Sequence, residues 1–310
     1  MPAIHTQGLS KDYRVGFWGR RLSVLRDVCL DIPAGEVFGY LGPNGAGKST
    51  TIKLLLGLVQ PTGGQASVLG HPAGDIRSRG RIGFLPENPS FYEYLTGQEF
   101  LRFCGRLLGV ARPQLRDQVQ RLLEEVGLSR AADQQIRKYS KGMVQRLGLA
   151  QALLGDPSLL ILDEPMSGLD PIGRKEVRDL ILRQKAAGRT VFFSTHILPD
   201  VEMICDRVGI LVGGRMVRLG PIGELLGEEV ESIEVTAAAV PPDTLQAAER
   251  YSLGPALHVG GHVMLRLQGE TELDRVLAVL VQAKCRVLSV VPQRRGLEEI
   301  FLAASREDRA

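Results

Sequence analysis

Cysteine is scarce in this sequence, and no two cysteines stand close together. Four cysteines are spread along the chain without a C-x-x-C pair: Cys29, Cys104, Cys205 and Cys285. A zinc site or a disulfide framework would need closely spaced or regularly patterned cysteines, so neither is indicated. Reduced thiols, as in a cytosolic protein, are the expectation.

Long apolar runs and a strong net charge are also missing. No apolar run reaches the roughly 18 residues of a membrane-spanning helix, and the N-terminus shows no signal-peptide pattern. The net charge is +3 over 310 residues, too near neutral to indicate nucleic acid binding by itself. We therefore expect a soluble chain that reaches a membrane only through a partner.

The hydrophobic content of 44% is ample for a core, and the length suggests one large domain and a smaller one.

The most informative stretch fits the pattern G-x-x-x-x-G-K-[ST] without a gap. It consists of Gly42, Pro43, Asn44, Gly45, Ala46, Gly47, Lys48, Ser49 and Thr50. A short apolar strand is predicted before it, at 37–41, and a helix after it, at 50–56. Glycines let backbone N–H groups converge on phosphate oxygens, and a helix N-terminus adds positive potential. Lys48 can reach the outer phosphates and the Ser49 hydroxyl can bind Mg²⁺. The alternative, a glycine-rich turn with a chance lysine, does not account for the flanking strand and helix.

Two acidic residues, Asp163 and Glu164, follow a second apolar strand predicted at 159–162. A carboxylate at such a strand end can support Mg²⁺ in P-loop enzymes. The next carboxylate can orient or deprotonate a water. The alternative, two ordinary solvent-facing acids, is weakened by the four apolar residues before them and by the P-loop.

Helical periodicity at 96–108 and 113–126 interrupts the rhythm of strands. We interpret this region, about 88–157, as a helical subdomain inserted in an α/β core that spans 1–227. Beyond 227 the predicted order is strand, helix, strand, strand, helix, strand, which is the split βαβ pattern. We predict a small α+β domain over 228–310.

Taken together, five motifs resemble, in their order, the nucleotide-binding subunits of ABC transporters. They are the glycine loop, Tyr139–Met143 as a variant of the family signature, Asp163-Glu164, Ser167–Asp170, and His196. The resemblance covers residue 4 to about 220 and implies a P-loop NTPase core of the ABC ATPase type. Within the family, the chain most resembles the exporter subgroup in which the ATPase is a separate chain with a C-terminal accessory region.

The resemblance implies a head-to-tail dimer, with a second copy or a homologous ATPase subunit, that encloses two ATP molecules with Mg²⁺. The P-loop of one chain would face the signature of the other, where Ser140 and Gly142 contact the γ-phosphate. An ordinary helix cap is the alternative for Ser140. The motif that ends at Asp170 belongs to the same nucleotide-binding set. His196 would contact the γ-phosphate and help to position the water that Glu164 activates, while Asp163 supports the metal.

Four positions either depart from the family's pattern or leave an alternative open. Tyr13 stands where the family has an adenine-stacking aromatic, although Phe17 or Trp18 could stack instead. Glu87 stands where most members have a glutamine that reaches the Mg²⁺, so it keeps a metal-binding oxygen but brings a negative charge close to Asp163 and Glu164. In the signature, Lys141 replaces a glycine and Met143 a glutamine.

The function implied is an ATP-hydrolysing subunit that powers an exporter together with a separate integral membrane permease. It would be cytoplasmic, held peripherally on the inner face of the cell membrane by that permease. The aromatic-rich segment 86–103 is the predicted permease surface, and no nucleic acid partner is expected. A non-transport ABC ATPase acting on nucleic acid or ribosomes is the alternative, but tandem ATPase halves and a long coiled coil are missing. Lys48, Asp163, Glu164 and His196 argue against a binding module that has lost catalysis.

Overall fold

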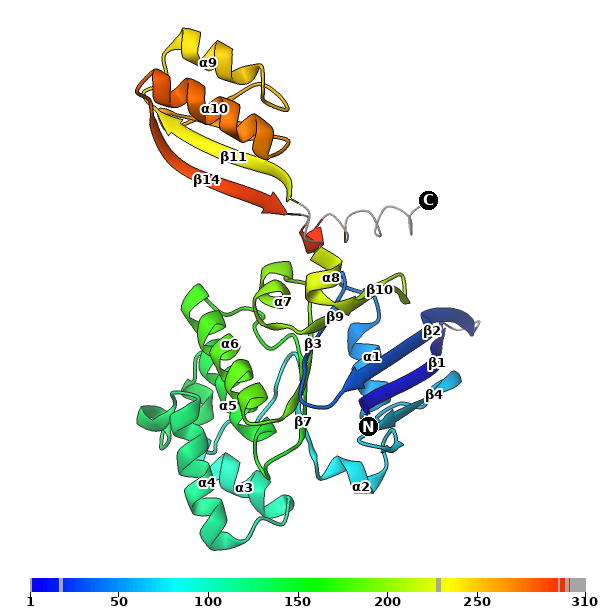
Figure 1. The fold of residues 1–310 in the computed structure, drawn as a ribbon. Helices are drawn as coiled ribbons and strands as arrows, with labels where there is room; N and C mark the ends of the chain where they lie inside the picture. The colour runs from blue at the N-terminus through cyan, green and yellow to red at the C-terminus, as the bar shows by residue number, and fades with distance from the viewer. Residues whose placement is uncertain (1, 17–18, 227–229, 295, 299–300, 302–310) are drawn as a thin grey trace. The chain divides into compact units, whose positions relative to one another are not determined.

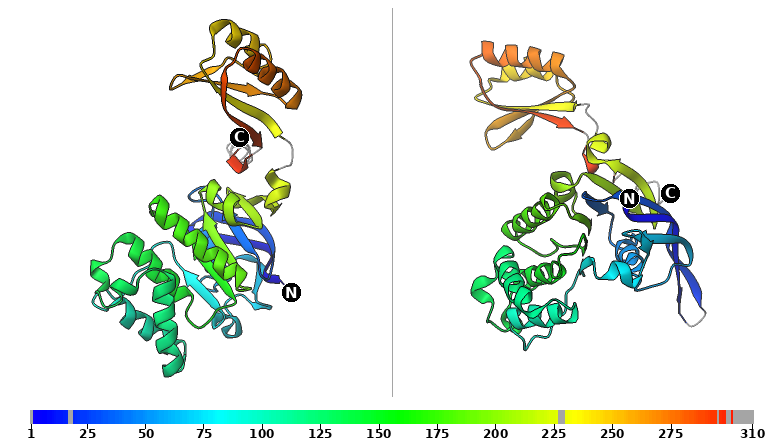
Figure 2. Two further views of the ribbon diagram at one scale, coloured as in Figure 1. Left: turned by 60° about the vertical axis from the view of Figure 1, so that its left-hand side comes forward. Right: turned by 60° about the horizontal axis from the view of Figure 1, so that its bottom comes forward.

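The structure is a computed structural model, in which residues 2–16, 19–226, 230–294, 296–298 and 301 are described. Its contacts divide the chain into two compact units, one containing Met1–Ile222 and the other containing Gly223–Ile300. Figure 1 shows the ribbon and Figure 2 two further views. Over the described ranges, none of the helices combines the length and hydropathy that crossing a bilayer requires.

A six-stranded, mostly parallel sheet forms the centre of the first unit. Its strands are β3 (Val37–Leu41), β6 (Ile82–Leu85), β7 (Leu159–Asp163), β8 (Thr190–Thr195), β9 (Arg207–Val212) and β10 (Arg215–Pro221). The order is β10-β9-β3-β8-β7-β6, with only β10 antiparallel to its neighbour. Every residue of β3, β7 and β8 is buried, because a parallel sheet is covered on both faces. This burial explains the continuous apolar runs in the sequence.

A second, antiparallel sheet lies against α1 and the parallel sheet. It has the order β2-β1-β4-β5, from β1 (Pro2–Val15), β2 (Arg20–Pro33), β4 (Gly63–Val68) and β5 (His71–Pro72). The sequence pattern predicts strands at 4–9 and 24–32, and β1 and β2 are both longer than this. Their register shifts at several points, including between Thr6 and Leu9 and between Leu9 and Lys11, so the alternation of apolar and polar residues that marks a strand is broken there.

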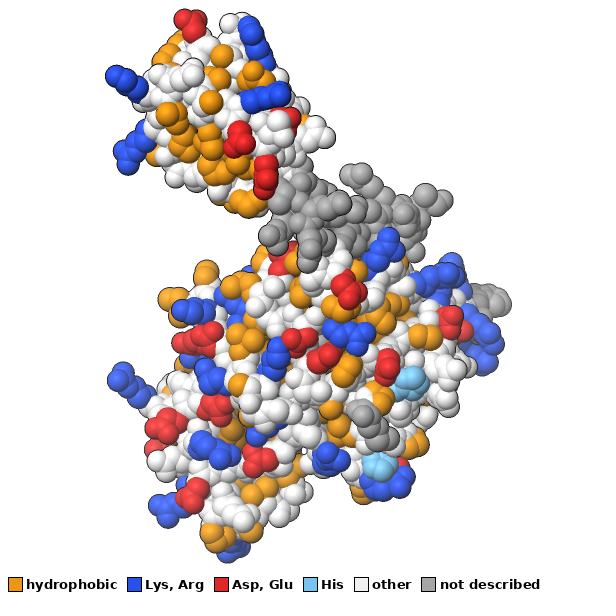
Figure 3. Space-filling view, viewed as in Figure 1, with side chains coloured by type: hydrophobic (Ala, Val, Ile, Leu, Met, Phe, Trp, Pro, Cys, Tyr) orange, Lys and Arg blue, Asp and Glu red, His pale blue; other side chains and the backbone are white. Residues whose placement is uncertain are grey.

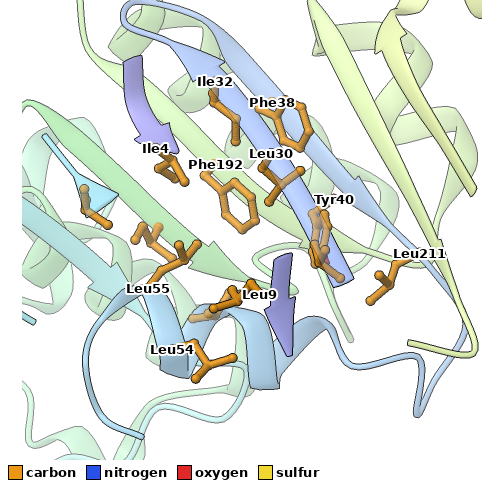
Figure 4. Packing of buried hydrophobic residues seen from close by; sticks show 14 of the residues in the cluster. Ile4, Leu9, Leu30, Ile32, Phe38, Tyr40, Leu54, Leu55, Phe192 and Leu211 are labelled. Atoms are coloured by element: carbon orange, nitrogen blue, oxygen red, sulfur yellow. The ribbon is translucent and has the colours of Figure 1, made fainter. Parts of the chain in front are cut away.

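The main hydrophobic core is enclosed by the two sheets and the helix that follows the P-loop, α1 (Lys48–Leu55). Figure 4 shows side chains of β1, β2, β3, β8, β9 and α1 meeting there. The Phe38 and Phe192 rings stack with centroids 5.7 Å apart. The Tyr40 hydroxyl, whose pKa is raised by burial, lies 3.0 Å from the Thr51 hydroxyl of α1. This packing fixes α1, and with it the P-loop, on the sheet.

Helices cover the other face of the parallel sheet. They are α5 (Lys141–Ala152), α6 (Pro171–Ala186) and α7 (Leu198–Ile204), and the helical insertion contains α3 (Gly97–Leu107), α4 (Arg112–Glu125) and the short 3₁₀ turns Ser129–Ala131 and Ile136–Lys138. Helix α3 begins with a reciprocal cap in which Thr96 Oγ1 accepts the Glu99 N–H and Glu99 Oε2 accepts the Thr96 N–H. The sequence did not predict α7 or α2 (Ile76–Arg79), which are too short to show a clear period.

The second unit has its own sheet and its own core. In chain order it contains β11 (Val230–Ala238), α9 (Pro242–Glu249), β12 (Leu257–Val259), β13 (His262–Leu267), α10 (Glu270–Gln282) and β14 (Arg286–Arg294), preceded by α8 (Ile222–Leu226). The sheet order is β12-β13-β11-β14. Helices α9 and α10 lie on one face of this sheet (Figure 2). Val235, Leu265, Val276 and Leu280 are buried in the core of this unit. The order of elements is the one predicted from the sequence.

Candidate functional site

Three neighbouring parallel strands, β3, β8 and β7, end at the candidate site. In the register of the sheet, Leu41 pairs with Thr195, and Asp163 pairs with Ser194. The P-loop, Glu164 and His196 each follow directly after one of these strand ends. In α/β folds, ligand sites form outside the carboxyl ends of the strands. The sheet therefore brings together motifs that lie more than 100 residues apart in the chain.

Two P-loop glycines are required by the close approach of other chain segments. A Cβ atom on Gly42 would lie 2.5 Å from the Leu211 carbonyl oxygen, and one on Gly47 would lie 2.6 Å from Leu25 Cδ2. Gly47 also has a φ of 108° and is the N-cap of α1, without a side chain to cap it. The first N–H groups of α1 thus have no side-chain cap and can bind an anion, as expected of a phosphate-binding loop.

Lys48 contacts both the P-loop and the acidic turn. Its Nζ donates to the Gly42 carbonyl oxygen at 2.6 Å and lies 3.2 Å from Glu164 Oε1. The side chains of Lys48 and Glu164 are only 6% and 7% exposed. A charged pair this well buried persists because each partner offsets the desolvation of the other. A bound phosphate would be a second anionic partner for the same lysine.

The turn after β7 has an unusual backbone conformation. Glu164 has a φ of +49°, a region that costs about 1–3 kcal/mol for a residue other than glycine and that clusters at functional sites. Its N–H donates to Ser194 Oγ at 3.0 Å, and Ser194 Oγ donates to Asp163 Oδ1 at 2.5 Å. The Glu164 carboxylate also lies 3.0 Å from His196 Nδ1. Glu164 therefore stands between Lys48 and His196.

A cavity of about 320 Å³ lies over the P-loop. Its lining residues are Val24, Pro43, Asn44, Gly45, Gly47, Lys48, Ser49, Thr50, Glu87 and Glu164. Seven of the nine residues of the P-loop motif, including Lys48, line the cavity. Two acidic residues, Glu87 and Glu164, line it as well. The cavity combines phosphate-binding backbone with acidic side chains, as a site for a metal–nucleotide complex requires.

The side chains near this cavity fit Mg²⁺. Ser49, Asp163 and Glu87 offer a hydroxyl and carboxylates, which are the hard oxygen ligands that Mg²⁺ prefers. In the part of the chain that the structure describes, however, no three acidic, histidine or cysteine side chains converge as a ready-made metal centre. The predicted closeness of Glu87 to Asp163 and Glu164 stays a prediction, although Glu87 and Glu164 line the same cavity. Mg²⁺ in phosphate sites needs only one or two protein carboxylates besides the phosphates.

Among the predicted site residues that do not line the cavity are Ser140, Gly142, Asp170 and Tyr13. Ser140 is exposed, and its Oγ accepts the Met143 N–H at 3.3 Å, which makes it the predicted N-cap of α5. Gly142 lies in the first turn of that helix. Asp170 Oδ1 accepts the Gly173 N–H at 2.9 Å and caps α6. Tyr13 lies on β1, with Lys11 Nζ 5.0 Å from its ring centroid.

The two other aromatic candidates for adenine stacking, Phe17 and Trp18, lie outside the described residues. The choice between these rings and Tyr13 therefore stays a prediction.

Sequence reasoning missed two side chains that hold the acidic turn. Ser194 is one, and Gln145 is the other: its Nε2 donates to the Pro165 carbonyl oxygen at 3.0 Å, and both groups are buried. The only sequence signal for Ser194 is its place two residues before His196 at the end of a strand. The partners of both residues lie at least 20 positions away in the chain, so local pattern could not reveal them.

Comparisons with known proteins agree with this geometry. The family model described as ABC transporter matches residues 25–167. An uncharacterized ABC transporter ATP-binding protein of Synechocystis sp. is 40% identical over 98% of this chain and 85% of its own length. The daunorubicin/doxorubicin resistance ATP-binding protein DrrA of Streptomyces peucetius is 37% identical over 97% of this chain and 92% of its own.

Solved structures extend the likeness to the fold. A structure described as the ATP-binding subunit of an ABC transporter superposes with a TM-score of 0.65 and 35% identity, covering 72% of this chain and 91% of that one. The P-loop cavity, the acidic turn and near full-length relatives lead to one conclusion: this chain is an ATPase of the ABC transporter ATP-binding protein family.

Proposed function

We propose that this chain is the ATP-hydrolysing subunit of an exporter, peripheral on the inner face of the cell membrane and bound there to a separate integral membrane permease. The observation that carries the catalytic part is the Glu164 carboxylate, held in the P-loop cavity between Lys48 and His196. Export is supported by the relative named for drug resistance, which matches nearly the whole chain.

The chemistry we assign to the chain is phosphoryl transfer from ATP to water. The P-loop backbone and Lys48 bind the β- and γ-phosphates, and Ser49 and Asp163 hold Mg²⁺, with Glu87 as a further oxygen ligand. Bound Mg²⁺ would neutralise charge that develops on the phosphate oxygens. Glu164 orients the attacking water and accepts its proton, and His196, 3.0 Å from that carboxylate, is placed to fix its orientation.

A second chain completes each site in this proposal. Ser140 is exposed, and a Cβ on Gly142 would lie 3.5 Å from Leu169 Cδ2 and 4.0 Å from Ser140 Oγ, both ordinary contacts. The chain by itself therefore has room for a larger residue at Gly142. A glycine is needed there if another molecule approaches the start of α5 closely, and the capped N-terminus of a 12-residue helix suits a phosphate. Both points support a head-to-tail dimer with the signature placed over the partner's ATP.

An exposed aromatic cluster in the helical insertion is the surface we assign to the permease. It comprises Tyr92, Tyr94 and Phe103, exposed by 50%, 67% and 40%. The Tyr92 ring lies 6.0 Å from that of Tyr94 and 5.7 Å from that of Phe103. Phe91, which also lies in the segment 86–103, packs instead on Phe100 inside the insertion.

Hydrophobic side chains are visible over this insertion in Figure 3. Contiguous exposed aromatics are typical of partner sites. They support placing the permease contact on the insertion, within the segment 86–103 that the sequence indicated.

Residues 228–310 form an accessory domain in this proposal, one that supports the dimer or regulates it. Their described part has a separate hydrophobic core around Val235, Leu265 and Val276. None of the residues that line the P-loop cavity comes from this part of the chain. We therefore propose that nucleotide binding does not depend on it.

Substituting Glu164→Gln tests the catalytic assignment. Because the amide keeps the shape but cannot accept a proton, ATP binding should persist while hydrolysis falls by about 10²–10⁴-fold, the usual loss for a general base. The ATP-bound protein should also accumulate as a dimer in size-exclusion chromatography. Glu124→Gln removes an exposed carboxylate on α4 and serves as the control, with turnover expected to be unchanged. Wild-type turnover in Glu164→Gln would rule out this role.

A further inference from the structure

The Ser194 hydroxyl connects the two carboxylate residues of the site. Ser194 is fully buried near the end of β8, directly opposite Asp163 in the register of the sheet. Its Oγ donates a hydrogen bond to Asp163 Oδ1 at 2.5 Å and accepts one from the Glu164 N–H at 3.0 Å. One small side chain therefore contacts the carboxylate of one acidic residue and the backbone of the next.

Both contacts restrain groups whose direction matters for the chemistry. A carboxylate with one oxygen fixed by a hydroxyl cannot rotate freely, so the direction of its second oxygen is also set. The Glu164 backbone is held at a φ of +49°, which is unfavourable for this residue type and needs support from its surroundings. That conformation directs the Glu164 side chain toward Lys48 and His196.

The neighbours of Ser194 make a hydroxyl here unexpected on packing grounds alone. It follows Val191, Phe192 and Phe193, all fully buried, in a strand covered on both faces. A polar group in such a place is costly unless it is hydrogen-bonded. Here both hydrogen-bonding roles of the hydroxyl are directed to the acidic turn.

We propose that Ser194 is a positioning residue for ATP hydrolysis, which orients the Asp163 carboxylate toward the metal and holds the turn that presents Glu164. This inference rests on the proposed roles of Asp163 and Glu164. Mutation of a residue that orients a metal-binding carboxylate typically lowers metal affinity or activity about 10–100-fold. A merely structural hydroxyl would affect stability alone.

The test compares Ser194→Ala with Thr190→Val in the full-length protein. Thr190 is a matched control, because it is a buried hydroxyl at the opposite end of β8 that accepts the Gly35 N–H. Affinity for a fluorescent ATP analogue is titrated against Mg²⁺, and kcat, KM and urea unfolding are measured for both variants. Ser194→Ala should raise the half-saturating Mg²⁺ concentration about tenfold and lower kcat about 10–100-fold. Its nucleotide affinity without metal should stay unchanged.

Thr190→Val should lose stability without changing the Mg²⁺ titration or kcat. Ser194→Thr keeps the hydroxyl, so its Mg²⁺ titration and its kcat should match those of the wild type. If Ser194→Ala does not fold, Ser194→Cys carries the same test, since a thiol is a poor hydrogen-bond donor. A folded Ser194→Ala protein with wild-type Mg²⁺ dependence and kcat would overturn the inference, as would equal changes in Thr190→Val. If Glu164→Gln still abolishes hydrolysis in that case, the proposed function stands and only the role of Ser194 fails.

Discussion

At the scale of single residues, Glu87 adds a negative charge to this site. The family resemblance implies a neutral glutamine at this position in most other members. Glu87 and Glu164 line the same cavity, and the phosphates of a nucleotide would add further negative charge there. Mg²⁺ offsets this repulsion. Glu87→Gln should therefore keep hydrolysis while flattening the Mg²⁺ dependence, so that the gain in nucleotide affinity on adding Mg²⁺ becomes about two- to fivefold smaller, the effect of a solvent-screened charge.

The measurement is nucleotide affinity titrated against Mg²⁺ for both proteins. Glu93→Gln changes an exposed acidic residue six positions further along the chain and is the control. Superimposable curves for wild type and Glu87→Gln would remove Glu87 from the metal site.

Some site residues could be predicted from the sequence and others could not, for a physical reason. The P-loop and the pair Asp163-Glu164 are contiguous, so their chemistry is legible in the local pattern. The hydrogen bonds of Ser194 and Gln145 join residues 20 or more positions apart. Only the register of β7 with β8 and the packing of α5 bring those partners together.

At the scale of elements, α3 and the loop before it carry the proposed permease contact. Tyr92→Ala combined with Tyr94→Ala should reduce co-purification with the permease about tenfold or more, because clustered aromatic anchors contribute about 2 kcal/mol or more each at interfaces. ATP binding should be spared, since neither ring lines the P-loop cavity. Leu253→Ala, a similarly exposed apolar side chain in the second unit, should leave co-purification unchanged. Undiminished complex formation by the double variant would show that the rings only cover the insertion.

Elements were predictable where burial was uniform and less so elsewhere. The fully buried strands β3 and β7 appear in the sequence as apolar runs and were placed nearly to the residue. The two strands of the β1–β2 pair were predicted too short. Its register shifts and its polar end beyond Leu9 remove the regular alternation on which strand prediction depends.

At the scale of the whole molecule, the active unit in this account is two chains. Within one chain the cavity contains P-loop residues and Glu164, whereas Ser140 and Gly142 lie at the start of α5, outside the cavity lining. No local sequence pattern can show that the site is shared between two chains, because this depends on how two copies face each other. The family resemblance implied it, and the exposed start of α5 supports it.

Mixing two inactive variants tests this central claim most directly. Lys48→Ala disables the P-loop and leaves the signature intact, while Gly142→Asp places a repelling charge in the signature, at a position where an added Cβ makes only ordinary contacts within the chain. Each variant alone should hydrolyse ATP at a small fraction of the wild-type rate. In an equimolar mixture, mixed head-to-tail dimers regain one intact site, so activity should recover to about one quarter of wild type for a symmetric homodimer. A mixture of folded variants that stays as inactive as its components would contradict the shared site.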